Sequence, residues 1–304
     1  MNLKFLMRSA LVAAAVGVFC ATPQQASAEL LTGLTDTTGG SNRLIRFDSA
    51  APGTILSNVA VTGLVAGDSL VGIDVRPATG GLYGLSLGSR LYLINPVTGA
   101  ATQVGSDGAF TLNGTQFGFD FNPTVDRIRV TTNADQNLRL NPNDGSVAGT
   151  DGTLAYAAGD PNFGANPNIT GSAYTNNVNG ATTTTLYNID SNLNVLVTQN
   201  PPNNGALNTV GSLGRDVPDI AGFDISSQSG VAYAAFINLS NGLNQLFTVN
   251  LTTGATTIVG NIGNGSINLV GLAVTVPEPG SLALAGFGVV GVFGGWLVRR
   301  RRAR

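Results

Sequence analysis

A five-residue segment centred on glycine recurs five times in this chain of 304 residues, and no other feature constrains the fold as strongly. The copies occupy residues 70–74, 116–120, 169–173, 220–224 and 269–273, and their glycines are separated by 46, 53, 51 and 49 residues. A period of about 50 residues indicates a repeated supersecondary unit.

Each copy reads as the first strand of a unit. Short runs rich in β-branched and aromatic residues follow it, and turn residues separate these runs. Two units match closely: residues 90–104 and 245–259 each contain two such runs around a turn at the same position, 96–99 and 251–254. Four strands in a unit of this length are typical of a β-propeller blade.

The first and last segments of the repeat region complete each other. Residues 30–34 resemble a second strand that lacks its glycine-centred first strand, and the missing strand comes last, at 269–274. If it completes the first blade, no open sheet edge remains at the joint. We therefore predict an all-β fold with a single β-propeller-like domain at 29–275, made of five four-stranded blades and closed by the C-terminal strand. The alternatives are two β-sandwiches, or six or seven blades.

The C-terminal segment, 276–304, predicts a membrane helix. Residues 281–298 carry no charge and, at about 1.5 Å per residue, form a helix of roughly 27 Å, enough to cross a bilayer core. Positive charges after the helix leave the C-terminus in the cytoplasm and the preceding body outside. These charges are Arg299, Arg300, Arg301, Arg302 and Arg304.

The N-terminal segment, 1–28, predicts a helical signal peptide. An apolar stretch at 10–19 follows Lys4 and Arg8, and Ala26 and Ala28 form an A-x-A site that predicts cleavage before Glu29. The one cysteine, Cys20, follows a bulky phenylalanine and does not fit a lipidation motif. Its removal leaves a mature chain without disulfides or thiol nucleophiles.

Composition excludes several classes of function. The chain has no histidine, so it can form no His-dependent triad, imidazole metal site or His general base. Between Glu29 and Val276 it has eight arginines against fifteen aspartates and one glutamate, a net charge of −8. Clustered positive charge is what phosphate binding needs, so nucleic acid is not an expected partner.

Pro277, Glu278 and Pro279, the apolar helix and the arginine cluster follow one another in an order that resembles the PEP-CTERM sorting signal of Gram-negative bacteria. The two prolines hold the motif extended. The resemblance implies that exosortase, a transpeptidase-like membrane enzyme, recognises and removes the tail as the protein passes to the surface or extracellular matrix. The alternative is a plain single-pass anchor that contains Pro-Glu-Pro by chance.

The body also resembles a family. Residues 118–123, 126–130, 136–142, 159–162 and 173–177 are similar to the uncharacterised domain of unknown function 4394, and the likeness extends over about 30–275. The resemblance implies a propeller-like fold and frequent PEP-CTERM tails. It supplies no activity.

Three arginines are candidate ligand-binding residues. Arg127 and Arg129 share one strand face because side chains alternate with period two, and Arg139 lies on a neighbouring strand. With Asp126 or Asp135 they could form a charged pocket for the carboxylate or sulfate of an acidic glycan, since guanidinium groups bind such anions in a bidentate manner. The alternative is an Arg–Asp ladder that fixes strand register.

Asp74, Asp120 and Asp224 occupy the same position in three repeats, where Ala173 and Ala273 stand in the other two. Aspartates around a propeller channel could bind Ca²⁺, which prefers several oxygen ligands. The favoured interpretation is that each accepts backbone hydrogen bonds at a strand end. We therefore predict no metal and no cofactor, with Ca²⁺ as the alternative.

These patterns favour an exported, non-enzymatic surface or extracellular-matrix protein that binds or organises exopolysaccharide or other envelope components. The alternative is an extracellular enzyme that acts on polysaccharide through Asp and Arg residues, and a third hypothesis is a structural protein without a ligand. The expected partners are signal peptidase, exosortase, transiently the inner membrane, and exopolysaccharide.

Overall fold

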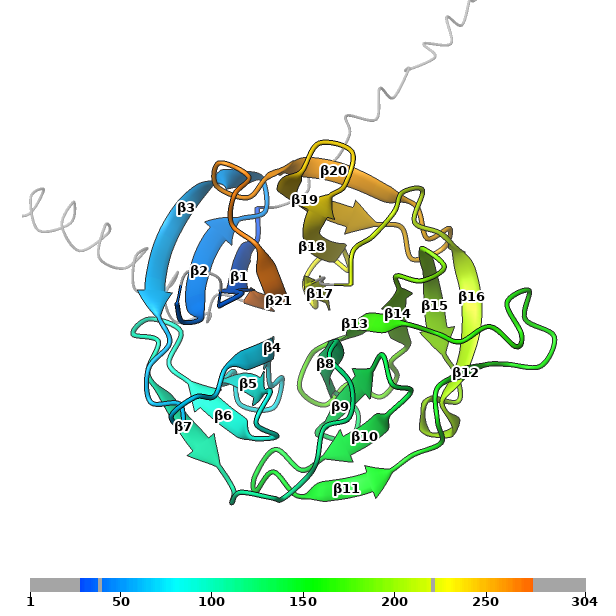
Figure 1. Cartoon of the computed structure of the whole chain (residues 1–304), viewed down its shortest axis with the longest axis horizontal. Coiled ribbons are helices and arrows are strands. Elements are labelled where there is room, and N and C mark those ends of the chain that lie inside the picture. Colours follow the sequence, from blue (N-terminus) through cyan, green and yellow to red (C-terminus); the bar gives the residue numbers. More distant parts are fainter. Residues whose placement is uncertain (1–27, 38–39, 220–221, 276–304) are drawn as a thin grey trace, which may run out of the picture.

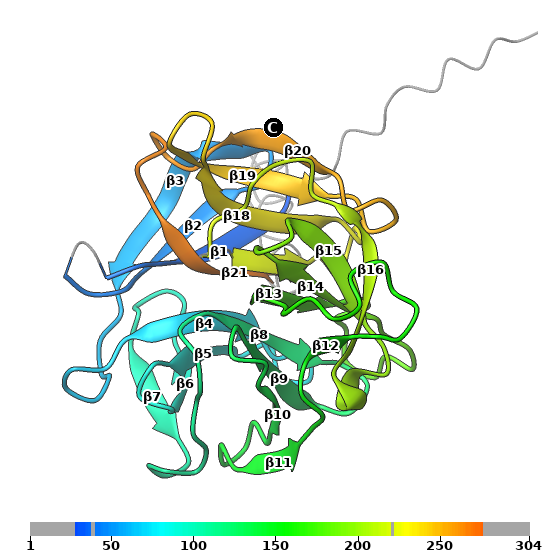
Figure 2. The same ribbon diagram turned by 45° about the vertical axis from the view of Figure 1, so that its right-hand side comes forward.

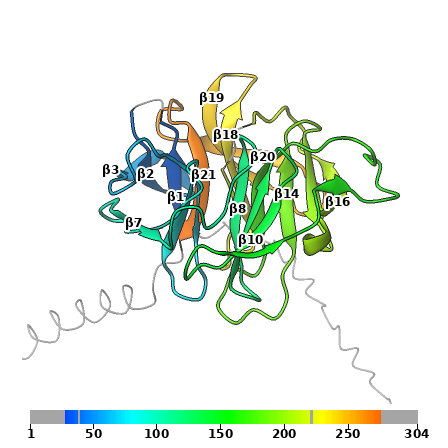
Figure 3. The same cartoon turned by 60° about the horizontal axis from the view of Figure 1, so that its bottom comes forward.

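The structure, a computed structural model, describes residues 28–37, 40–219 and 222–275. Five sheets surround a common axis, with β21, β4, β8, β13 and β17 innermost (Figures 1 and 2). Seen closer to its edge, the ring has β8 and β21 running across its thickness (Figure 3). The predicted five-bladed β-propeller is thus confirmed.

Blade 1 joins both ends of the described chain. From the axis outward it consists of β21 (Leu269–Thr275), β1 (Leu30–Thr35), β2 (Arg43–Asp48) and β3 (Ala51–Ala60). The closing strand β21 is antiparallel to β1 and pairs with it from end to end. The ring therefore closes through backbone hydrogen bonds, as the missing first strand of the repeat predicted.

The other blades follow in chain order, each from the axis outward. Blade 2 consists of β4 (Leu70–Val75), β5 (Leu82–Ser86), β6 (Leu91–Ile94) and β7 (Ala101–Val104). Blade 3 consists of β8 (Phe117–Asn122), β9 (Arg127–Thr132), β10 (Asn137–Leu140) and β11 (Val147–Thr150). Blade 5 consists of β17 (Gly222–Ile225), β18 (Ala232–Asn238), β19 (Leu243–Val249) and β20 (Thr256–Asn261).

Blade 4 departs from the predicted four strands. It consists of β13 (Ile169–Tyr174), β14 (Leu186–Asp190), β15 (Val195–Gln199) and β16 (Ala206–Ser212), and the 3-10 helix η1 (Pro202–Asn204) precedes β16. A fifth strand, β12 (Ala155–Tyr156), pairs in parallel with the outer edge of β16. The long middle region thus covers an exposed sheet edge and, within the described residues, forms no sixth blade.

The hydrophobic core lies between neighbouring blades. In one cluster Phe236 and Phe247 of blade 5, stacked with ring centroids 4.1 Å apart, pack with Ala173 of blade 4. In another, the rings of Tyr83 in blade 2 and Phe121 in blade 3 form an edge-to-face pair with centroids 5.3 Å apart. Inner strands are buried along most of their length because both of their faces contact a neighbouring blade.

The contacts at the axis explain why the repeated residue is glycine. A Cβ added to Gly72 would lie 2.9 Å from Cβ of Phe119, and one added to Gly222 would lie 2.9 Å from Cβ of Leu272. In both cases the obstacle is the residue that directly follows the glycine of the next blade. The inner strands approach so closely that only glycine leaves room at this position.

The terminal segments lie outside the described residues. These are the predicted signal peptide up to residue 27, the Pro277-Glu278-Pro279 motif, the predicted helix 281–298 and the arginines that follow it. No helix among the described residues has the length and apolar character needed to cross a membrane.

Candidate functional site

Three aspartates meet on the propeller axis. Asp74 on β4, Asp120 on β8 and Asp224 on β17 each follow the repeat glycine by two residues, and each is about 1% exposed. One carboxylate oxygen from each lies within 4.8 Å of those of the other two. The fivefold repeat therefore concentrates three carboxylates at one point, which we call the axial triad.

Each member of the axial triad bonds to the next blade. In every case the donor is the backbone N–H of the residue three positions after the next blade's glycine, so each aspartate joins adjacent inner strands. The bonds run from Phe121 N to Asp74 Oδ2 (2.8 Å), from Tyr174 N to Asp120 Oδ1 (3.2 Å) and from Val274 N to Asp224 Oδ2 (2.6 Å). This geometry agrees with the favoured interpretation of backbone hydrogen bonding.

The carboxylate of Asp120 accepts fewer hydrogen bonds than those of Asp74 and Asp224. The remaining oxygens of Asp74 and Asp224 each accept the N–H of the next residue in the chain, at 2.6 Å. In contrast, Asp120 Oδ2 is buried and has no hydrogen-bond partner among the described residues. It is the one oxygen of the axial triad left without a donor.

Burial and the charges of nearby carboxylates raise the pKa values of the axial triad. Burial, and next the charge of Asp224, raises the pKa of Asp74 well above its usual range, and burial with the charges of both partners does the same for Asp120. Burial raises the pKa of Asp224 to about 7, to which the charge of Glu29 also contributes. No ion pair among the described residues involves any of the three.

A cavity of about 280 Å³ opens where the inner strands end. Val75 and Ile225, which follow Asp74 and Asp224 directly, line it. Its polar lining includes Arg76, Asn177 and Ser227, and Val274 and Thr275 of the closing strand complete it. At the level of the repeat glycines the axis is much narrower, with a space of about 10 Å³, roughly that of one water molecule.

The predicted arginine pocket is divided in two. Register pairs Arg139 directly with Arg129, and both guanidinium groups bind one carboxylate, that of Asp151, at 2.8 and 2.6 Å. Sequence reasoning had favoured Asp126 or Asp135 for this role. Arg129 is 1% exposed, so this group forms an internal ladder across β9, β10 and the segment after β11. Its geometry agrees with the register-fixing alternative.

Arg127 and Asp126 lie apart from that ladder. Nη1 of Arg127 donates to the backbone oxygen of Asp126 at 2.9 Å. The Asp126 carboxylate pairs with Arg76 of blade 2, with Nε to Oδ1 at 2.8 Å, and these hydrogen bonds lower its pKa. Asp135 sits in a left-handed turn with φ 60°, and burial raises its pKa. The five predicted charges thus do not form a single pocket.

Glu29, the predicted first residue of the mature chain, is buried at the ring closure. Its carboxylate accepts hydrogen bonds from the hydroxyl groups of Ser226, Ser229 (3.1 Å) and Tyr233 (2.8 Å) of blade 5. The residue just before the proposed cut, Ala28, is exposed. Glu29 therefore joins blade 1 to blade 5 through its side chain.

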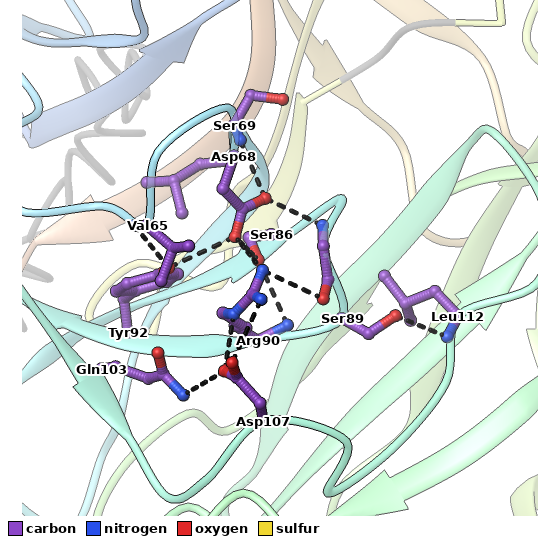
Figure 4. A network of polar contacts seen from close by, with 12 residues as sticks. Val65, Asp68, Ser69, Ser86, Ser89, Arg90, Tyr92, Gln103, Asp107 and Leu112 are labelled. Atoms are coloured by element: carbon purple, nitrogen blue, oxygen red, sulfur yellow. Dashed lines mark hydrogen bonds and ion pairs between the residues drawn. The ribbon is translucent and has the colours of Figure 1, made fainter.

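Sequence reasoning missed a further buried carboxylate, that of Asp68. It accepts hydrogen bonds from Ser86 Oγ at 2.7 Å, Arg90 Nη1 at 3.1 Å and Tyr92 Oη at 3.2 Å (Figure 4). Burial alone would raise the pKa of Asp68, but the hydrogen bonds from Ser86, Arg90 and two backbone N–H groups lower it. Arg90 also binds Asp107 at 2.7 Å, so the network holds the loop before β4 against blade 2. No spacing in the sequence signals these contacts.

A family comparison agrees with these features. The model of the domain of unknown function DUF4394 matches residues 43–273. The chain belongs to this family. A PEP-CTERM protein-sorting motif matches residues 275–302, directly after the DUF4394 domain. Among curated proteins, the search found no match.

Solved structures resemble the DUF4394 domain at low sequence identity. A Bacteroides thetaiotaomicron protein of unknown function is 15% identical with a TM-score of 0.45, covering 80% of this chain and 63% of that one. A Bacteroides uniformis protein assigned provisionally as a 6-phosphogluconolactonase is 14% identical with a TM-score of 0.42, covering 77% and 82%. TolB from Acinetobacter baumannii is 12% identical with a TM-score of 0.40, covering 77% of this chain and 53% of TolB.

Proposed function

We propose that this protein is an exported, non-enzymatic binding module of the cell envelope or its exopolysaccharide. The observation that carries the proposal is the PEP-CTERM motif at 275–302, which implies export and membrane anchoring before exosortase processing. The DUF4394 domain is then the part released to the outside. Its closed ring forms a rigid scaffold without disulfides, which suits that setting.

The axial cavity is the binding site that we favour. It combines apolar walls, such as Val75 and Ile225, with uncharged polar groups from Asn177, Ser227 and Thr275. Pockets of this mixed character can hold the apolar face of a sugar while a few polar groups bind its hydroxyls. Arg76, the one charged residue of this lining, is already paired with Asp126, so we favour a neutral glycan over an acidic one.

An extracellular polysaccharide-acting enzyme is the second candidate. Carboxyl groups with raised pKa values beside a cavity resemble the acids of an active site. Against this, the axial triad is nearly inaccessible, and each carboxylate binds a backbone N–H of the next blade. A general acid must reach within hydrogen-bond distance of its substrate, so we favour binding without turnover.

Glycan arrays with the full chain purified in detergent would test the proposal. We expect saturable binding to neutral polysaccharide and no new reducing or unsaturated ends after long incubation. Ser227→Phe, which fills the cavity, should weaken binding at least about tenfold, since a blocked pocket loses its contacts. Ser106→Phe makes the same change on the exposed outside of blade 2 and should have no effect.

The other outcomes separate the alternatives. New reducing or unsaturated ends would identify an enzyme and contradict the proposal. Absence of binding, together with loss of matrix cohesion in a deletion strain, would favour a structural protein without a ligand. Equal binding by both phenylalanine variants would mean that the glycan binds somewhere other than the axial cavity.

A further inference from the structure

The axial triad places three acidic side chains in a region from which water is largely excluded. Its residues are about 1% exposed, and the ion pairs of the described residues include none of them. Buried ionised carboxylates require a positive partner, or they must take up protons.

The spacing of the axial triad fits one ion. Oxygen ligands lie about 2.3–2.6 Å from Ca²⁺, so two ligands on opposite sides of it are separated by about 4.6–5.2 Å. One oxygen from each aspartate lies within 4.8 Å of those of the other two. All three can therefore contact a common cation.

An independent feature also points to a ligand. Asp120 Oδ2 is buried and has no hydrogen-bond partner among the described residues, although both oxygens of Asp74 and Asp224 are occupied. A buried acceptor without a donor is uncommon in a folded protein and calls for an ion or a water molecule.

We propose that the propeller axis binds one Ca²⁺ ion through Asp74, Asp120 and Asp224. The ligand set is purely oxygen, which suits a hard cation rather than a transition metal that prefers imidazole or thiolate. Ca²⁺ tolerates an irregular shell, so water can supply the ligands that the protein does not. The ion cross-links blades 2, 3 and 5 at the centre of the ring, a role separate from glycan binding in the cavity.

Equilibrium dialysis with radioactive Ca²⁺ alone, on the EDTA-treated full chain in detergent, would test this site. We expect one Ca²⁺ per chain and a higher unfolding temperature in Ca²⁺ than in EDTA, because a ligand of the folded state stabilises it. Asp120→Asn keeps an acceptor for the Tyr174 N–H but removes the charge, and should weaken Ca²⁺ binding at least about tenfold. The matched control, Asp107→Asn on the surface of blade 2, should bind as wild type.

Two results would overturn the proposal. One is the absence of Ca²⁺ binding by the wild-type protein at millimolar concentration, and the other is equal affinity in Asp120→Asn and wild type. If Asp120→Asn does not fold, Tb³⁺ replaces the variant as a probe of the wild-type chain. Tyrosine-sensitised Tb³⁺ emission that disappears when Ca²⁺ displaces the Tb³⁺ supports the site, because the backbone N–H of Tyr174 is hydrogen-bonded to Asp120. Absence of such emission contradicts the site.

Discussion

At the scale of single residues, a glycine and an aspartate two positions apart hold the inner strands together. The glycine lets the next blade approach, and the aspartate accepts an N–H from that same blade. Each of these residues therefore contacts the inner strand of the next blade. The sequence repeat thus reflects the packing between neighbouring blades.

Gly72→Ala tests the close approach. The new Cβ would lie 2.9 Å from Cβ of Phe119, so we expect a loss of about 1–3 kcal/mol in the free energy of unfolding, as for other overpacked cores. Urea denaturation measures it. Gly53→Ala is the control, because its nearest neighbour is 3.6 Å away, and it should change stability by less than about 0.5 kcal/mol. Equal stability of the two variants would contradict the role given to Gly72.

Asp224 makes stability depend on pH. Its carboxyl has a pKa of about 7 in the fold and about 4 when unfolded, so its contribution is present at acid pH and is lost as the pH rises toward 7. In EDTA, the free energy of unfolding of wild type relative to Asp224→Asn should fall by more than about 1 kcal/mol between these values. Ca²⁺ should reduce that fall. A constant difference across the range, measured by urea denaturation, would rule out the shift.

At the scale of strands, buried charge fixes register in blade 3. Arg129→Met removes the fully buried one of the two guanidinium groups that bind Asp151 and leaves this carboxylate with Arg139 alone, so we expect a cost of about 3 kcal/mol in guanidinium-induced unfolding. Arg127→Met is the matched control on the same strand. It loses one bond to a backbone oxygen and should cost about 1 kcal/mol. Similar losses in both variants would mean that the ladder is not what stabilises the blade.

The closing strand β21 should be more sensitive to proline than an outer strand. Ala273 pairs with Thr32 of β1, and its N–H faces β1 because the N–H of the next residue, Val274, points to Asp224 on the axis. Ala273→Pro therefore removes a bond of the closing ladder, at a cost of about 3 kcal/mol or more. Val259→Pro lies on the outer edge of blade 5, beside a register shift, and should be tolerated better. Thermal unfolding followed by circular dichroism compares them. A smaller effect at Ala273 would argue against closure by β21.

Element positions could be predicted from the sequence where the signal is local. The five glycine-centred segments fixed the number of blades, and the absence of a first strand before residue 30 indicated how the ring closes. The two-residue strand β12 was not predictable, because its parallel pairing with β16 depends on tertiary structure. Likewise Asp151 lies in an irregular segment, and only the folded register shows that it binds Arg129 and Arg139.

At the scale of the whole molecule, the sorting motif predicts a change in the C-terminus. If exosortase processes the chain, the extracellular form should lack the residues after Pro277-Glu278-Pro279, and Glu278→Ala should retain them. Mass spectrometry of the secreted protein detects either form. Asp144→Asn, on an exposed turn of blade 3, is the control and should be processed normally. An intact C-terminus in the wild-type extracellular protein would contradict processing.

The pairing of β21 with β1 also sets the order of events during synthesis. Every other strand of the ring is made before β21, so blade 1 stays incomplete until the ribosome has nearly finished the body. By then the sorting segment that directly follows β21 is the next to emerge. Completion of the fold and synthesis of the sorting signal are therefore nearly simultaneous, and a chain that stops early has neither a closed ring nor a sorting tail.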